Sequence, residues 1–112
     1  MRLCIFEDNT YSNFYPLTYL RPTFQLRCGI FTLYERIVKA FAPDEINVIC
    51  RKNLNPTLRD SGFDPVTSAF TLEGRMLFIN GAVIDAFALS RSITLLPDAN
   101  TFYVSDGRLV AA

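Results

Sequence analysis

Three short apolar runs, separated by long segments, constrain the fold of this chain more than any other feature. They are Leu3 to Phe6, Ile46 to Cys50 and Met76 to Ile79. Short continuous apolar runs are typical of strands buried on both faces of a sheet, and two parallel strands need a crossover of about a dozen residues or more. We therefore predict that the three runs are parallel strands of one sheet, joined by right-handed crossovers.

Helical periodicity appears between these strands. Apolar residues recur at helical spacing from Ile30 to Phe41, which predicts a helix over Ile30 to Ala42 that Pro43 ends. The segment Asn55 to Asp60 fits a single helical turn, and Asp85 to Ser92 fits a helix with an acidic residue at its positive N-terminus.

The end of the chain carries turn signals. Asn80-Gly81 suits either a tight turn or a strand-end loop, and we favour the strand end. Asp106-Gly107, between Thr101 to Ser105 and Arg108 to Ala111, predicts a hairpin. The expected fold class is α/β, a Rossmann-like doubly wound, mostly parallel sheet with a C-terminal β-hairpin.

The composition indicates one folded, soluble domain over residues 1–112. Half of the residues are hydrophobic and 20% are charged, and 11 basic residues balance 11 acidic ones. Because the net charge is zero, the chain has no overall electrostatic field that would attract nucleic acid or an anionic membrane, and neither is an expected partner. No stretch is long enough to span a bilayer, and the first residues turn acidic too early for a signal peptide. We expect a cytoplasmic domain that folds on its own or with a copy of itself.

A long polar segment from Asn9 to Gly29 follows the first strand, and loops of this length are usually functional. Asp8 stands where the strand opens into this loop. Arg21 and Arg27 lie near the expected helix start at Cys28 to Phe31, where backbone amides and a guanidinium suit phosphate. The alternative is that both arginines pin the loop by pairing with Glu7, Asp8 or carbonyl groups.

The same region resembles the signature of sugar-1-phosphate nucleotidyltransferases. Pro16-Leu17-Thr18, Arg21-Pro22, Leu26, Gly29 and the helix Leu33 to Ile37 stand at the offsets of that family, and Phe78 to Gly81 resembles its strand end. The chain is most similar to a divergent branch, the N-terminal part of proteins that resemble bifunctional acetylglucosamine-1-phosphate uridylyltransferase. Because it also stops directly after a strand, we expect the N-terminal fragment of a longer chain.

The resemblance departs from the family pattern at catalytic positions. The glycine-rich loop that normally ends in Gly-Thr-Arg falls on Glu7 to Asn13, which holds no glycine, and Asn13 takes the place of the arginine. Ala82 stands where the family has an aspartate that holds the catalytic magnesium. We therefore expect the isolated chain to be inactive. The alternative function is a degenerate, non-catalytic domain used for assembly or interaction.

The resemblance also implies binding roles, although it assigns no catalytic residue and no metal ligand. It implies phosphate contacts for Arg21 and Arg27, a cation or ribose contact for Asp8, and a sugar or base contact for Asn80, with Thr18 also in the substrate site. The implied partners are a nucleoside triphosphate and a sugar phosphate. The implied cofactor is magnesium, in the full-length parent if that parent is active.

Overall fold

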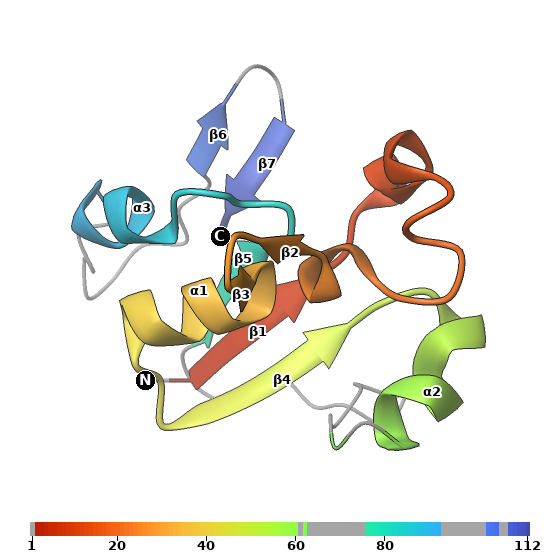
Figure 1. Ribbon diagram of the computed structural model, residues 1–112. Coiled ribbons are helices and arrows are strands. Elements are labelled where there is room, and N and C mark those ends of the chain that lie inside the picture. The colour runs from red at the N-terminus through yellow and green to blue at the C-terminus, as the bar shows by residue number, and fades with distance from the viewer. Residues whose placement is uncertain (1, 61, 63–75, 93–102, 106–107) are drawn as a thin grey trace.

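A five-stranded sheet forms the centre of the molecule (Figure 1). The computed structural model describes residues 2–60, 62, 76–92, 103–105 and 108–112. Strand β1 (Arg2–Phe6) lies between β4 (Glu45–Ile49) and β5 (Met76–Asn80) and runs parallel to both. The prediction of three parallel strands in one sheet is therefore confirmed.

The order of these strands has a consequence for ligand binding. The chain first adds β4 on one side of β1 and then returns to add β5 on the other side. This reversal is the hallmark of doubly wound α/β sheets, in which ligands bind outside the carboxyl ends of the strands where the order reverses. The reversal point here lies between β1 and β5.

The other edge of the sheet is antiparallel. Strand β7 (Arg108–Ala111) pairs with β5, and β6 (Tyr103–Ser105) pairs with β7 with an irregularity at Tyr103 and Val104. The turn predicted at Asp106-Gly107 lies outside the described residues. The architecture is mixed α/β and is compatible with a Rossmann-like fold.

Helix α1 (Leu33–Phe41) begins later than the periodicity predicts. Two short strands precede it, β2 (Arg27–Cys28) and β3 (Phe31–Thr32), which pair as an antiparallel ribbon. The Thr32 side chain accepts a hydrogen bond from the backbone N–H of Glu35 at 3.1 Å and donates one to the Glu35 carboxylate at 3.2 Å, so the two residues form a capping box. The predicted start at Ile30 is wrong because the apolar periodicity continues into the ribbon.

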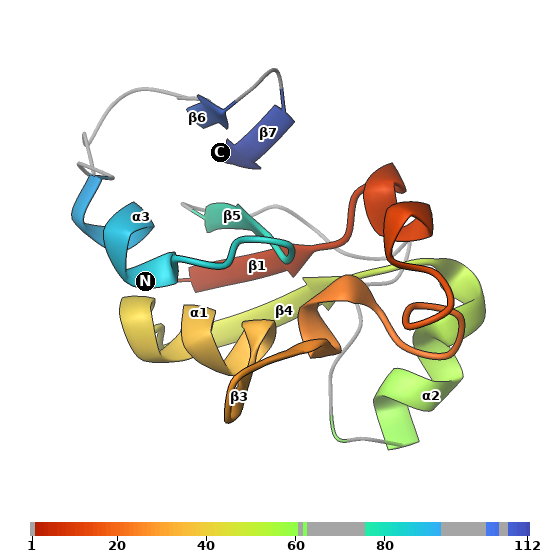
Figure 2. The ribbon, with the colours of Figure 1, turned by 45° about the horizontal axis from the view of Figure 1, so that its top comes forward.

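Two other helices match the sequence predictions. Helix α2 spans Asn55–Asp60, and α3 spans Ala86–Ser92, with the Asp85 carboxylate accepting a hydrogen bond from the backbone N–H of Ala88 at 3.0 Å. Figure 2 shows α1 and α3 next to each other at the side of the sheet. None of the helices among the described residues is long and apolar enough to cross a membrane.

The long segment after β1 is not a plain loop. It contains a 3-10 helix η1 (Asn9–Phe14) and a second 3-10 turn η2 (Thr23–Gln25), and another 3-10 turn, η3 (Lys52–Leu54), follows β4. Phe24 of η2 is fully buried and anchors the segment in the core.

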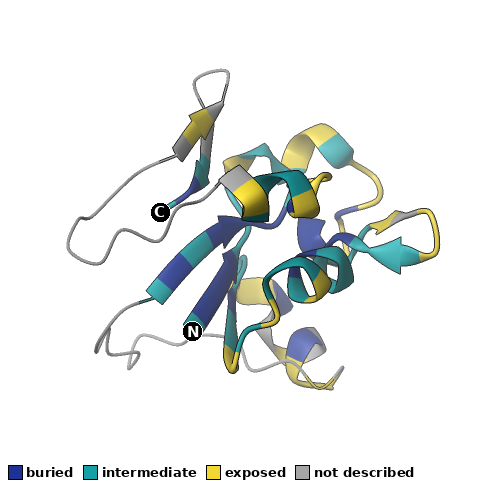
Figure 3. Ribbon diagram, turned by 90° about the vertical axis from the view of Figure 1, so that its left-hand side faces the viewer, coloured by how far each residue is buried: buried dark blue, intermediate teal, exposed yellow. Residues whose placement is uncertain are grey.

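The core lies between the sheet and these helices, and β1 is its most deeply buried strand (Figure 3). The buried residues of this core are Leu3, Ile5, Phe24, Ile37, Val48, Leu58, Leu77, Ile79, Ala86 and Ala111. The burial of consecutive β1 residues explains why that strand appears in the sequence as a continuous apolar run.

Candidate functional site

The carboxyl ends of β1 and β5 meet at the point where the strand order reverses. Asp8 follows β1, and Asn80, which is 5% exposed, ends β5. The Asn80 Nδ2 donates a hydrogen bond to Asp8 Oδ2 at 2.9 Å, while Asn80 Oδ1 accepts one from the backbone N–H of Ala82 at 2.9 Å. The structure thus brings together two of the predicted site residues, at the edge where such folds bind ligands.

Asp8 also caps the 3-10 helix η1. Its Oδ1 accepts hydrogen bonds from the backbone N–H of Thr10 at 3.0 Å and from the Thr10 hydroxyl. The stretch in which the resemblance places a glycine-rich phosphate loop is therefore a capped helical turn that continues through Asn13. This conformation follows from the sequence, because aspartate at an N-cap satisfies amide groups that would otherwise lack partners.

A buried ion pair lies directly beside this site. The Glu7 side chain is 1% exposed and the Arg51 side chain 15% exposed, and Arg51 Nη2 lies 3.2 Å from Glu7 Oε1. Arg51 Nε and its backbone N–H donate to Glu7 Oε2 at 3.2 and 3.3 Å. The backbone N–H and hydroxyl of Thr23 donate to Glu7 Oε1 at 3.2 and 3.3 Å. Such a pair is tolerated in the interior because hydrogen bonds satisfy both charges.

Arg51 fastens the long segment across the end of β1. Its Nη2 donates hydrogen bonds to the carbonyl of Thr18 and, at 3.1 Å, to the carbonyl of Arg21. Its guanidinium also lies 4.0 Å from the centre of the Tyr11 ring. The contacts with Glu7 and with loop carbonyls that the sequence suggests for Arg21 and Arg27 are thus made mainly by Arg51, although Arg27 also donates to one backbone carbonyl, that of Ile30.

The sequence does hold a signal for Arg51. Arg51 closely follows β4, and Glu7 directly follows β1, so two opposite charges stand at the carboxyl ends of strands that are predicted to be parallel. The backbone N–H of Glu7 donates to the carbonyl of Ile49 at 2.9 Å, which brings these two strand ends together.

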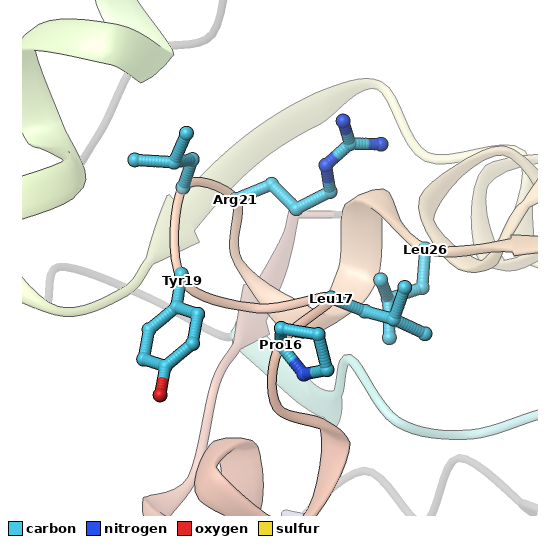
Figure 4. Close-up of a pocket in the computed structure, with 6 residues that line it drawn as sticks. Pro16, Leu17, Tyr19, Arg21 and Leu26 are labelled. Atoms are coloured by element: carbon cyan, nitrogen blue, oxygen red, sulfur yellow. The ribbon is translucent and has the colours of Figure 1, made fainter.

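Arg21 is exposed and lines a shallow pocket of about 400 Å³ (Figure 4). Within the described part of the chain, no hydrogen bond or ion pair engages its guanidinium. The other residues that line the pocket are Pro16, Leu17, Tyr19, Leu20 and Leu26. The pocket is therefore largely apolar with one available cation.

Arg27 lies elsewhere, in the β2–β3 ribbon. It is exposed, and its Nη1 donates to the carbonyl of Ile30 at 3.1 Å. The predicted helix start over Cys28 to Phe31 is wrong, because these residues belong to the ribbon and the helix is capped at Thr32.

Thr18 is buried inside the long segment. Its hydroxyl donates to the carbonyl of Tyr11 at 2.6 Å, and its own carbonyl accepts from Arg51. These contacts give Thr18 a part in holding the segment together.

Gly81 has no room for a side chain. Its backbone N–H donates to the carbonyl of Phe6 at 2.7 Å, and a Cβ added at this position would lie 2.8 Å from the Phe24 Cβ. The end of β5 is thereby packed against both the end of β1 and the long segment. Glycine is required here for close approach and not for an unusual backbone conformation.

The donor atoms at this edge do not fit a magnesium ion held by the chain alone. Among the described residues no group of three or more acidic, histidine or cysteine side chains could hold a metal. The Glu7 carboxylate is committed to Arg51, and Ala82 has no side-chain oxygen. Asp8 by itself supplies too few ligand oxygens, because magnesium requires six oxygen donors in octahedral geometry.

Burial disfavours the reactive thiolate form of two cysteines, Cys4 and Cys50. Burial raises the pKa of Cys4 to about 11. Burial, with the nearby Glu7 charge, also raises the pKa of Cys50 to about 11. Both thiols therefore remain protonated at neutral pH, and the thiolate is the reactive form.

No curated protein and no solved structure matches this chain significantly. A family model described as sugar nucleotidyl transferase matches residues 3–112, which is nearly the whole chain. The match includes the end of β1, the long segment and the end of β5. The chain therefore belongs to the sugar nucleotidyl transferase family.

Proposed function

We propose that this chain is the nucleotide-binding, N-terminal part of a sugar-1-phosphate nucleotidyltransferase-like protein. The observation that carries the proposal is the hydrogen bond between Asn80 and Asp8, which joins the ends of β5 and β1 where the strand order reverses. Open α/β sheets bind their ligands at such points, and the family match supports a nucleotide as the ligand.

The proposed roles follow from chemistry and exposure. Arg21 binds the phosphates, because a guanidinium forms bidentate hydrogen bonds with phosphate and no described group engages this one. Asp8 contacts the ribose or a cation, and Asn80 contacts the sugar or the base. Thr18 supports the site from within the long segment. The phosphate contact of Arg27 stays a prediction from the sequence.

In the full-length parent, an oxygen of the sugar 1-phosphate would attack the α-phosphate of the nucleoside triphosphate, and pyrophosphate would leave. This chain contributes binding and positioning to that reaction. Any magnesium in the parent would be held mainly by phosphate oxygens, since the carboxylate of Glu7, which stands next to Asp8 at this edge, is already paired with Arg51. We expect no nucleotidyl transfer by the isolated chain, because Asn13 and Ala82 lack the groups that stabilise the departing pyrophosphate and bind the metal.

A second candidate function is a non-catalytic domain of the same family, used for assembly or interaction. It is favoured by the capped 3-10 helix that replaces the glycine-rich loop and by the alanine at position 82. This candidate requires no nucleotide binding, so a binding measurement separates the two.

Isothermal titration calorimetry of the purified chain with nucleoside triphosphates tests the proposal. The Arg21→Gln variant should bind about 10-fold to 150-fold more weakly, as expected for loss of a charge-assisted hydrogen bond, with the melting temperature unchanged. Arg59→Gln is the matched control, since Arg59 is an exposed arginine of α2. Absence of binding at millimolar nucleotide would contradict the proposal and favour the non-catalytic domain.

A further inference from the structure

Three tyrosines of the long segment form a continuous aromatic ladder. Tyr11 and Tyr15 meet edge to face, with ring centres 6.0 Å apart, and Tyr15 and Tyr19 are stacked at 4.2 Å with an angle of 14° between the rings. The Arg51 guanidinium lies over Tyr11 at the inner end of the ladder. Because Arg51 is itself held by the buried Glu7, the ladder is ordered from its buried end.

The outer end of the ladder is open to solvent. Tyr15 is 42% exposed and Tyr19 is 58% exposed, and the neighbouring Leu17 and Leu20 are 63% and 81% exposed. Exposed apolar side chains that gather on an ordered segment are typical of a binding surface. Tyr19 is also one of the residues that line the pocket of about 400 Å³, and its ring extends from the loop on another side than the Arg21 guanidinium (Figure 4).

The chemistry of the pocket points to one class of ligand. Its lining residues are mostly apolar, one of them is the aromatic residue Tyr19, and its one charged lining residue is Arg21, whose guanidinium extends beyond the loop (Figure 4). A flat ring that carries an anionic group satisfies all three features, whereas a purely apolar partner would leave the cation unused. Arg51 contacts both the Arg21 carbonyl and Glu7, the residue before Asp8, and so links the loop that carries this pocket to the end of β1.

We propose that Tyr19 is a stacking platform for the base of a nucleotide whose phosphates are bound by Arg21. This inference rests on the proposed nucleotide-binding function and adds to it the mode of base recognition. Stacking accepts every base, because each base presents a flat aromatic face. The site should therefore select nucleotides over inorganic phosphates, with only a modest preference among bases.

Calorimetry with ATP, UTP and inorganic tripolyphosphate tests the platform. Both nucleotides should bind at least about fivefold more tightly than tripolyphosphate, and Tyr19→Leu should lower nucleotide affinity by about 5-fold to 150-fold, the range expected for one base stacked on one ring. Tyr19→Phe keeps the ring and should keep the affinity. Phe87→Leu is the matched control, since Phe87 is an aromatic residue of α3 that is 52% exposed.

The possible failures are distinguishable. If Tyr19→Leu leaves nucleotide affinity unchanged while Arg21→Gln lowers it, the proposed stacking role of Tyr19 is wrong and the proposed nucleotide-binding function stands. Equal losses of nucleotide and tripolyphosphate affinity in Tyr19→Leu would also overturn the platform, because the ring would then act only through the shape of the segment. If neither nucleotide nor tripolyphosphate binds the unaltered chain, the proposed function fails and the platform fails with it.

Discussion

Replacement of Arg51 by methionine should destabilise the whole fold, although Arg51 lies in none of the helices and strands. The substitution keeps much of the side-chain volume and removes the guanidinium. It leaves the Glu7 carboxylate, which is 1% exposed, without its opposite charge. It also leaves the carbonyl groups of Thr18 and Arg21 without the hydrogen bonds that fasten the long segment.

The magnitude follows from these contacts. Removal of one partner of a buried, hydrogen-bonded ion pair typically costs about 3–5 kcal/mol. A domain of 112 residues has a free energy of unfolding of about 5–15 kcal/mol, so the loss is a large fraction of the total. With a shift of about 4 °C for each kcal/mol at this size, the melting temperature should fall by about 12–20 °C.

Urea denaturation followed by circular dichroism measures the effect. Arg59→Met is the control, and we expect it to change the free energy of unfolding by less than about 0.5 kcal/mol, as for other exposed positions. The double variant Glu7→Leu/Arg51→Met should be more stable than Arg51→Met alone, because it removes the unpaired buried charge. A loss below about 1 kcal/mol in Arg51→Met, or a double variant less stable than the single one, would refute the reasoning.

Three further predictions concern stability. Gly81→Ala should lower the free energy of unfolding by about 1–3 kcal/mol, because its Cβ would overlap Phe24, and an unchanged urea midpoint would contradict the close packing at this strand end. Thr32→Ala should cost about 1 kcal/mol through loss of the N-cap of α1, and thermal melting measures it; equal stability would show that the capping box contributes nothing. Burial raises the pKa of Cys4 and Cys50 from 9.0 to about 11, so the folded state holds these protons more tightly than the unfolded state does. The contribution of the two thiols to the free energy of unfolding is therefore complete below pH 9 and should be lost as the pH rises through about 11. Urea midpoints measured from pH 8 to 11 should show this fall, and a smaller one in Cys4→Ala; a flat profile would count against it.

Much of the fold could be predicted because its signals are local. The apolar runs reveal β1, β4 and β5 to within a residue or two, because burial in a sheet favours apolar residues along a strand. Burial is deepest in the central strand β1 and only partial in the edge strand β4. Helices α2 and α3 follow from turn residues and short-range hydrogen bonds. The positions of Asp8 and Asn80 at strand ends are predictable for the same reason.

Other features could not be predicted from local patterns. The β2–β3 ribbon delays the start of α1 although the apolar spacing continues through it, because antiparallel pairing competes with the helix for the same backbone groups. Asp8 and the arginines of the loop are predicted from the sequence as site residues, but Arg51 is not. The Glu7–Arg51 pair joins positions 44 residues apart and exists only because β4 lies beside β1 in register.

The sequence by itself therefore determined the three parallel strands, the helical segments and the strand ends that carry Asp8 and Asn80. The tertiary structure decided which charges meet, which of them are buried, and which arginine is left available at the pocket. The physical reason is the separation along the sequence over which each kind of interaction acts. Burial and periodicity act on neighbouring residues along the chain, whereas ion pairs, aromatic stacking and the close approach at Gly81 depend on the order and register of strands that are distant in sequence.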